Sequence, residues 1–203
     1  NCYLFHFLFS FVILFISNLS AGWMNLVIIS HFLVYLYSLK LQHWPIIGNL
    51  IVALLCSIVL IIPYWLTDKF WELENFNLSE NLNQLFVIFC FLLTVKREIV
   101  KDLEDIQGDL KTSSYTLPIL IGEKLSKLVL GVLVIISIGF LIICALESTK
   151  NIQNMGFFFT MISLLIAFIY KTYKSFEKTD FKKLSNLLKI NFLAAGIWLY
   201  ILL

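Results

Sequence analysis

The sequence predicts an all-α protein, a polytopic bundle of transmembrane helices. Of its 203 residues, 60% are hydrophobic and only 14% are charged, whereas a soluble domain has about 25% charged residues. A membrane-spanning helix needs about 20 mainly apolar residues, and seven runs approach that length. They lie near residues 2–18, 22–38, 46–66, 82–97, 126–146, 155–171 and 186–203.

The first run suggests that the sequence is the later part of a longer protein. It starts NCYLFHFLFS, with no Met and no basic residue ahead of the apolar stretch. A secretory signal peptide would have a charged segment there and a small-residue cleavage site after the run. No linker or internal repeat divides the runs. We therefore expect residues 1–203 to form a single membrane-embedded domain that is incomplete at its N-terminus.

The second and third runs favour helices packed within a membrane. His31 lies in the middle of the second run. An ionisable group there can be functional, but we interpret this imidazole as a partner in a helix–helix hydrogen bond. The third run contains LIVALLCSIVLIIPYWL, which is apolar on every face. The strands of a membrane β-barrel would instead alternate apolar and polar residues, so helices are the prediction.

The distribution of basic residues predicts the orientation in the membrane. With seven helices, the loops near 39–45, 97–125 and 172–185 share one side. These loops and the adjoining helix ends carry all fifteen Lys and Arg residues except Lys69 and Lys150. Because cytoplasmic loops gather Lys and Arg, we expect that side to be cytoplasmic. The chain is then a multi-pass integral membrane protein, of the plasma membrane if prokaryotic, with no nucleic-acid partner.

The fourth run leads into an acidic segment, KDLEDIQGD, at residues 101–109. If its helix continues through this segment, four acids recur every three or four residues and share one face, with Gly108 a candidate helix end. The four are Glu98, Asp102, Asp105 and Asp109. Such a row repels itself, so a cation is expected beside it. The alternative is a solvated loop whose acids pair with its own lysines.

Carboxylates beside cationic side chains suit a phosphorylated ligand. Mg²⁺ binds through one or two carboxylates and shares its other positions with water and substrate phosphates. Arg97 and Lys101 flank the acidic face, and Lys40 comes from the preceding loop on the same side; all three are candidates to meet phosphate charge. A diphosphate at the membrane surface, with a hydrophobic tail between the helices, fits both halves of the protein.

Two segments resemble one known family. REIVKDLEDIQGDLKTSSYTLPILIGEK, residues 97–124, resembles the second aspartate-rich motif and following segment of the UbiA superfamily of intramembrane prenyltransferases. Its form is most similar to geranylgeranylglycerol-phosphate geranylgeranyltransferases. YLYSLKLQHWPIIGNLIVA, residues 35–53, resembles the family's Tyr and Lys loop, which leads into a Gly-Asn helix start.

The resemblance implies a larger fold than these residues supply. The family has nine transmembrane helices, and the seven expected here are equivalent to the third to the ninth. The family's first aspartate motif, of the form N-D-x-x-D, is absent from the 203 residues. Either an N-terminal segment is missing or the chain is a degenerate, inactive relative; the absence of an initiator Met favours the first.

The resemblance also implies the site residues and the cofactor. In the family, two aspartate motifs bind the diphosphate of an allylic prenyl donor through Mg²⁺, which neutralises the charge that develops as the C–O bond ionises. By position, the catalytic and metal-binding residues are Asp102, Asp105 and Asp109. The substrate-binding residues are Lys40, Tyr37, Arg97, Lys101 and Thr116.

The function implied is a Mg²⁺-dependent prenyl transfer to a lipid-like acceptor, with transfer of geranylgeranyl to geranylgeranylglycerol phosphate the closest match. Prenylation of an aromatic quinone precursor is the neighbouring alternative. A non-catalytic membrane protein and a transporter are the others. Transporters have interrupted helices or ionisable groups at mid-membrane, whereas Pro63 is the only proline within a run and acidic and basic residues are expected only near the helix ends.

Overall fold

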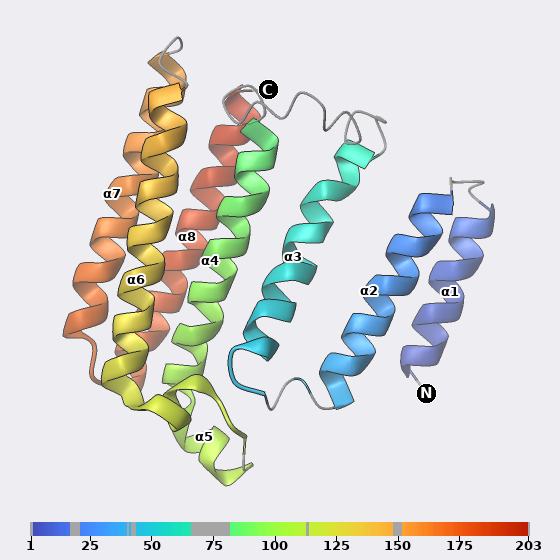
Figure 1. Ribbon diagram of the computed structural model, residues 1–203, viewed down its shortest axis with the longest axis horizontal. Coiled ribbons are helices and arrows are strands. Elements are labelled where there is room, and N and C mark those ends of the chain that lie inside the picture. Colours follow the sequence, from blue (N-terminus) through green and yellow to red (C-terminus); the bar gives the residue numbers. More distant parts are fainter. Residues whose placement is uncertain are drawn as a thin grey trace.

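The computed structural model describes residues 2–16, 21–39, 41, 44–65, 82–112, 114–147 and 152–202. The all-α prediction is confirmed for these residues, among which no strand occurs. The helices run alternately up and down along one layered bundle (Figure 1). They are α1 (Cys2–Ile16), α2 (Ala21–Leu39), α3 (Ile47–Trp65), α4 (Leu82–Glu104), α5 (Ile106–Lys111), α6 (Leu117–Glu147), α7 (Ile152–Lys174) and α8 (Lys178–Leu202).

Three helices extend well beyond the apolar runs that predicted them. α4 ends at Glu104, α6 begins at Leu117 and α8 begins at Lys178, each several residues further than the apolar pattern indicated. All three extensions lie at the end of the bundle that carries α5 (Figure 1). They are rich in Lys, Glu and Leu, which favour helix whether or not they are buried. Charged helix ends therefore surround the acidic segment.

The surface of the bundle is strongly apolar. Within the described residues, two stretches are long and apolar enough to cross a membrane, Leu117–Leu146 in α6 and Met155–Lys174 in α7. Shorter apolar helical stretches occupy Val27–Leu39 and Ile47–Val59. Large apolar side chains face outward on α6 and α7, where Ile135 is 66% and Phe159 77% exposed. Contiguous exposure of this kind marks an interaction or membrane surface.

The core of the bundle centres on α4, which packs against α3, α6 and α8. α1 and α2 pair with one another beside α3. Between them, Ser10 Oγ lies 3.4 Å from His31 Nε2, while His31 Nδ1 lies 2.9 Å from the carbonyl oxygen of Val27. The interpretation of His31 as a helix–helix hydrogen-bond partner is confirmed. The largest fully buried side chains include Phe89, Leu93, Leu130, Phe158, Met161, Leu165, Phe168, Leu184 and Leu188.

One basic residue assigned to a helix end lies inside the bundle. Lys96 is fully buried in α4, and its Nζ donates to Ser137 Oγ of α6 at 2.5 Å. Ser137 in turn donates to the Leu133 carbonyl at 2.7 Å. The prediction that basic residues lie only near helix ends is wrong here. The apolar run ended at this charge, whereas the helix continues for another two turns.

The acidic segment does not continue α4 as a single helix. α4 ends at Glu104, Asp105 has φ −115° and ψ 23°, and α5 begins at Ile106. The prediction of an unbroken helix through this segment is wrong. Asp favours caps and turns because its short side chain competes for nearby backbone groups. As a result α5 turns away beneath the end of the bundle (Figure 1).

A second break occurs near the start of α6. Gly122 has φ 81° and ψ 161°, a backbone conformation that is open almost only to glycine. It separates a short first segment, which begins at Leu117, from the long helix. The short segment lies across the end of the bundle next to α5 (Figure 1). This kink keeps the chain after the acidic segment close to the bundle end.

We expect Gly122→Ala to lower the free energy of unfolding by about 1–3 kcal/mol, the cost of forcing a side-chain-bearing residue into this conformation. Thermal unfolding in one detergent measures the change. Gly139→Ala is the matched control, because Gly139 is also in α6 and an added Cβ there meets nothing within 4 Å. Equal stability of the two variants would contradict the account of the kink.

Candidate functional site

A cavity of about 300 Å³ opens at the end of the bundle, where α3 begins and α4 meets α5. It unites the two segments that sequence analysis singled out, 35–53 and 97–124. Among the predicted site residues, six line it: Tyr37, Lys101, Asp102, Asp105, Asp109 and Thr116. The remaining lining residues are Trp44, Pro45, Ile46, Asn49, Glu98, Thr112 and Ser114. We call this cavity the carboxylate pocket.

Asp102 is held from across the helix interface. Asn49, in the first turn of α3, donates from Nδ2 to Asp102 Oδ2 at 2.8 Å. Burial raises the pKa of Asp102 from 3.8 to about 6. The Asn49 hydrogen bond opposes this shift, while the nearby Asp109 and Glu98 carboxylates add to it. Asp102 is thus an acid whose charge is costly until a cation approaches.

Asp109 is fixed by the segment that follows α5. Thr116 Oγ1 donates to Asp109 Oδ2 at 3.1 Å, and the Ser114 backbone N–H donates to the Asp109 carbonyl at 3.0 Å. Thr112 and Ser114 hydroxyls are 2.9 Å apart on the same wall. The chain between α5 and α6 therefore folds back on the acidic segment and orients one of its carboxylates.

Asp105 lies at the break itself. Its Oδ1 accepts an ion pair from Lys178 Nζ of α8 at 3.2 Å. Its carboxylate also folds over Gly108: a Cβ at Gly108 would stand 2.7 Å from Asp105 Oδ2. A larger residue at Gly108 would push this carboxylate aside. The geometry gives Gly108 a packing role in the acidic motif.

Glu98 is the buried acid of the group. Its side chain is only 6% exposed, and it pairs with Arg97 at 2.8 Å and with Lys101 at 3.4 Å. Arg97 does not line the carboxylate pocket, but it lines the neighbouring cavity between α4 and α8. Lys40, the remaining predicted contact, falls outside the described residues. The two basic residues on α4 thus balance the charge of Glu98.

The pocket fits a cation that shares its ligands with a substrate. No three His, Cys, Asp or Glu side chains in the described part of the chain are close enough to hold a metal ion by themselves. Mg²⁺ needs only one or two carboxylates when phosphate oxygens and waters complete its octahedron. Asp102 and Asp109 both face the same space. Their oxygen donors suit Mg²⁺ bound together with a phosphorylated ligand.

Comparison with known proteins places the chain in a family. Residues 3–195 match the UbiA prenyltransferase family. The chain belongs to the UbiA prenyltransferase family. This is an integral membrane family, in accord with the apolar helices, and the resemblance of the two motif segments is confirmed.

Similar curated proteins carry one name. A digeranylgeranylglyceryl phosphate synthase of Methanosphaera stadtmanae is 32% identical over 194 residues, 94% of this chain and 66% of the relative. The synthase of Methanobrevibacter smithii is 30% identical over 90% of this chain and 62% of its own length. That of Pyrococcus horikoshii is 37% identical over 53% of this chain and 36% of its own. The chain spans less than two thirds of the first two relatives. No solved structure matches it.

Two residues of the site carried no predicted role. Asn49 belongs to the Gly-Asn helix start of the first motif, and that position alone signalled it. Lys178 is 73 residues from Asp105 in the sequence, so only the packing of α8 against α4 reveals the pair. Its spacing with Lys182 and Lys189 places all three on one side of α8. That periodicity was the available signal.

Asn49→Leu should weaken Mg²⁺ binding and move its acid limb to higher pH. A carboxyl must be ionised to bind the cation, so affinity falls as the pH drops through about 6, the pKa of Asp102. Loss of the Asn49 hydrogen bond raises that pKa further, by about one unit for a bond worth roughly 1 kcal/mol. Titration of Mg²⁺ at several pH values measures the shift.

Ser57→Ala serves as the control for this titration. Ser57 is also on α3, and its hydroxyl bonds only to the Ala53 carbonyl of its own helix at 2.8 Å. Its removal should leave the pH profile in place. A profile that stays unchanged in Asn49→Leu would show that Asp102 does not govern metal binding.

Proposed function

We propose that the protein is a Mg²⁺-dependent prenyltransferase. It transfers geranylgeranyl from its allylic diphosphate to geranylgeranylglycerol phosphate. Its family, and the name shared by the relatives that match 94% and 90% of the chain, support this activity. The observation that carries the proposal is the meeting of two distant motifs in one pocket, where the start of α3 hydrogen-bonds an acid of α4.

The carboxylate pocket is proposed to receive the donor diphosphate. Asp102, Asp105 and Asp109 supply oxygen ligands for Mg²⁺, which neutralises the diphosphate as it leaves the allylic carbon. Asn49 orients the Asp102 carboxylate and Thr116 orients that of Asp109. The site is then complementary to a leaving group with developing negative charge, which is the requirement for catalysis rather than simple binding.

The remaining predicted contacts act on the substrate. Lys101 is 59% exposed at its side chain and lines the pocket, so it is free to turn from Glu98 toward a phosphate. We assign Arg97 and Lys40 the same kind of contact, and the Tyr37 hydroxyl a position on the pocket wall. The isoprenoid tail runs between the apolar helices, where water is excluded and the allylic cation is protected.

The membrane arrangement follows from the same proposal. The seven long helices are proposed to span the bilayer as equivalents of the third to the ninth helices of the family fold. The carboxylate pocket opens at the basic, cytoplasmic side. In the full-length protein, a second acidic motif from preceding helices completes the metal site. The lipid acceptor then reaches the pocket from within the membrane.

Asp109→Asn in the full-length protein should reduce the rate of prenyl transfer at least about 100-fold, because metal stabilisation of the leaving group contributes several kcal/mol and each 1.36 kcal/mol is tenfold. Asp105→Asn should act in the same direction. The assay uses labelled geranylgeranyl diphosphate, geranylgeranylglycerol phosphate and Mg²⁺. Both variants should unfold at nearly the same temperature as the unmodified protein, since each loses charge repulsion along with a contact.

Glu177→Gln is the matched control, since Glu177 is an exposed acid at the same end of the bundle but outside the pocket. It should retain full activity. A rate unchanged in Asp109→Asn, or activity that survives removal of Mg²⁺ by a chelator, would refute the proposed role.

A further inference from the structure

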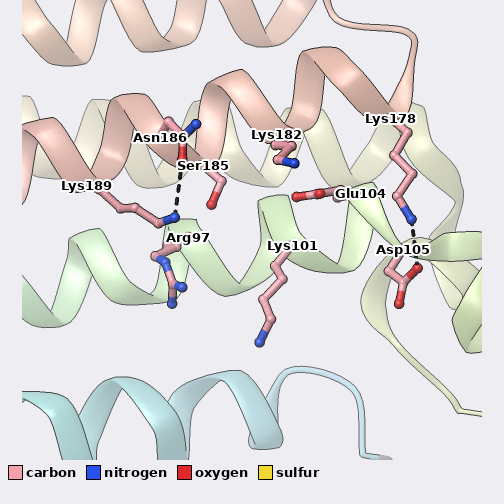
Figure 2. Close-up of a pocket in the computed structure, with 9 residues that line it drawn as sticks. All are labelled: Arg97, Lys101, Glu104, Asp105, Lys178, Lys182, Ser185, Asn186 and Lys189. Carbon is pink, nitrogen blue, oxygen red and sulfur yellow. Dashed lines mark hydrogen bonds and ion pairs between the residues drawn. The ribbon is translucent and has the colours of Figure 1, made fainter.

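A second cavity lies between α4 and α8 and is predominantly basic. Its volume is about 360 Å³. Five cationic side chains line it, together with two acidic ones, Glu104 and Asp105. The cations are Arg97, Lys101, Lys178, Lys182 and Lys189. We call this cavity the basic groove; Figure 2 shows the side chains of α8 and α4 gathered along it.

The excess of positive charge in the groove is only partly balanced. Lys178 pairs with Asp105 at 3.2 Å. Lys182 and Lys189 form no ion pair with any acid in the described residues, and Lys189 donates only to the Asn186 amide oxygen at 3.2 Å. Lysines that repel one another along one helix face are destabilising. An anion bound between them would remove that cost.

The groove has the depth of a lipid headgroup region. Lys178, Lys182 and Lys189 recur at i, i+4 and i+11 on α8, a span of about 16 Å along the helix. The face continues toward the apolar end of α8 with side chains that remain exposed. Leu193 is 65% exposed and Ile197 60%. A cationic track that passes into an apolar one matches an amphiphile with an anionic head and a hydrocarbon tail.

The groove adjoins the carboxylate pocket. Lys101 and Asp105 line both cavities, so ligands in the two would sit on opposite sides of the α4 end. The carboxylate pocket needs a metal ion before it accepts an anion. The basic groove presents cations directly, and a phosphate monoester is a compact anion of about −1.5 to −2 charge at pH 7. The two cavities therefore suit two different phosphorylated groups.

We propose that the basic groove binds the phosphate monoester of the lipid acceptor, with Lys182 and Lys189 as its principal contacts, and so holds the acceptor beside the donor pocket. This inference rests on the proposed function. The acceptor tail lies along the apolar continuation of α8. Its phosphate contacts the lysines as point charges and Arg97 through the planar guanidinium. Lys182 and Lys189 are thereby specificity-determining residues for a phosphorylated acceptor.

The test uses the full-length protein in bilayer discs of neutral lipid, with Lys182→Gln and Lys189→Gln combined. We expect the KM for geranylgeranylglycerol phosphate to rise at least about tenfold, while the KM for geranylgeranyl diphosphate changes less than about twofold. The dephosphorylated acceptor should react equally slowly with both proteins. Lys183→Gln is the control, because Lys183 is one residue away but pairs with Asp180 at 3.5 Å outside the groove.

A binding measurement separates this inference from the proposed function. Fluorescent phosphate-monoester lipid is titrated without Mg²⁺ and without donor, so no turnover is needed. Loss of binding in the double variant, and its rescue in Lys182→Arg/Lys189→Arg, would support the groove even if no prenyl transfer were found. Unchanged binding in the double variant would overturn it. Equal competition by phosphatidylglycerol would also overturn it, since the groove would then be a general anionic-lipid site.

Discussion

Repulsion among carboxylates at one end of an apolar bundle is the constraint on which the site depends. Glu98, Asp102 and Asp109 contribute to one small pocket, and burial makes ionisation of Asp102 costly. Each acid has its own compensation: basic neighbours for Glu98, an amide for Asp102 and a hydroxyl for Asp109. None of these partners removes the need for a cation. The fold holds the acids together in readiness for a ligand that brings one.

The break at Asp105 follows from the same constraint. In a single straight helix, the acids would form a row along one face, with Asp109 two turns beyond the end of α4. The break turns α5 beneath the bundle, and Thr116 then reaches Asp109. The kink at Gly122 brings the following chain back to the α6 position. Two short irregularities thus convert a linear motif into a concave one, with Asp105 left between the two cavities.

Sequence periodicity predicted much of this arrangement, and the reasons for its failures are physical. Apolar runs located the long helices, because the need to bury or expose apolar area leaves a strong local signal. The same signal ended each run at its first charge, so it missed the burial of Lys96 and the extension of α8 to Lys178. The spacing of the acids was read correctly, but the break at Asp105 depends on competition between side chain and backbone. The Asp105–Lys178 pair depends on packing across 73 residues of sequence.

The most direct test is a structure of the full-length protein with Mg²⁺ and an unreactive thio-analogue of geranylgeranyl diphosphate. The account predicts the diphosphate in the carboxylate pocket, with metal density between its oxygens and the carboxylates of Asp102 and Asp109. Density for the tail should continue between the helices. A diphosphate bound elsewhere, or bound in the pocket with no metal contact to these acids, would contradict the central claim that the acids are gathered to hold a metal–diphosphate pair.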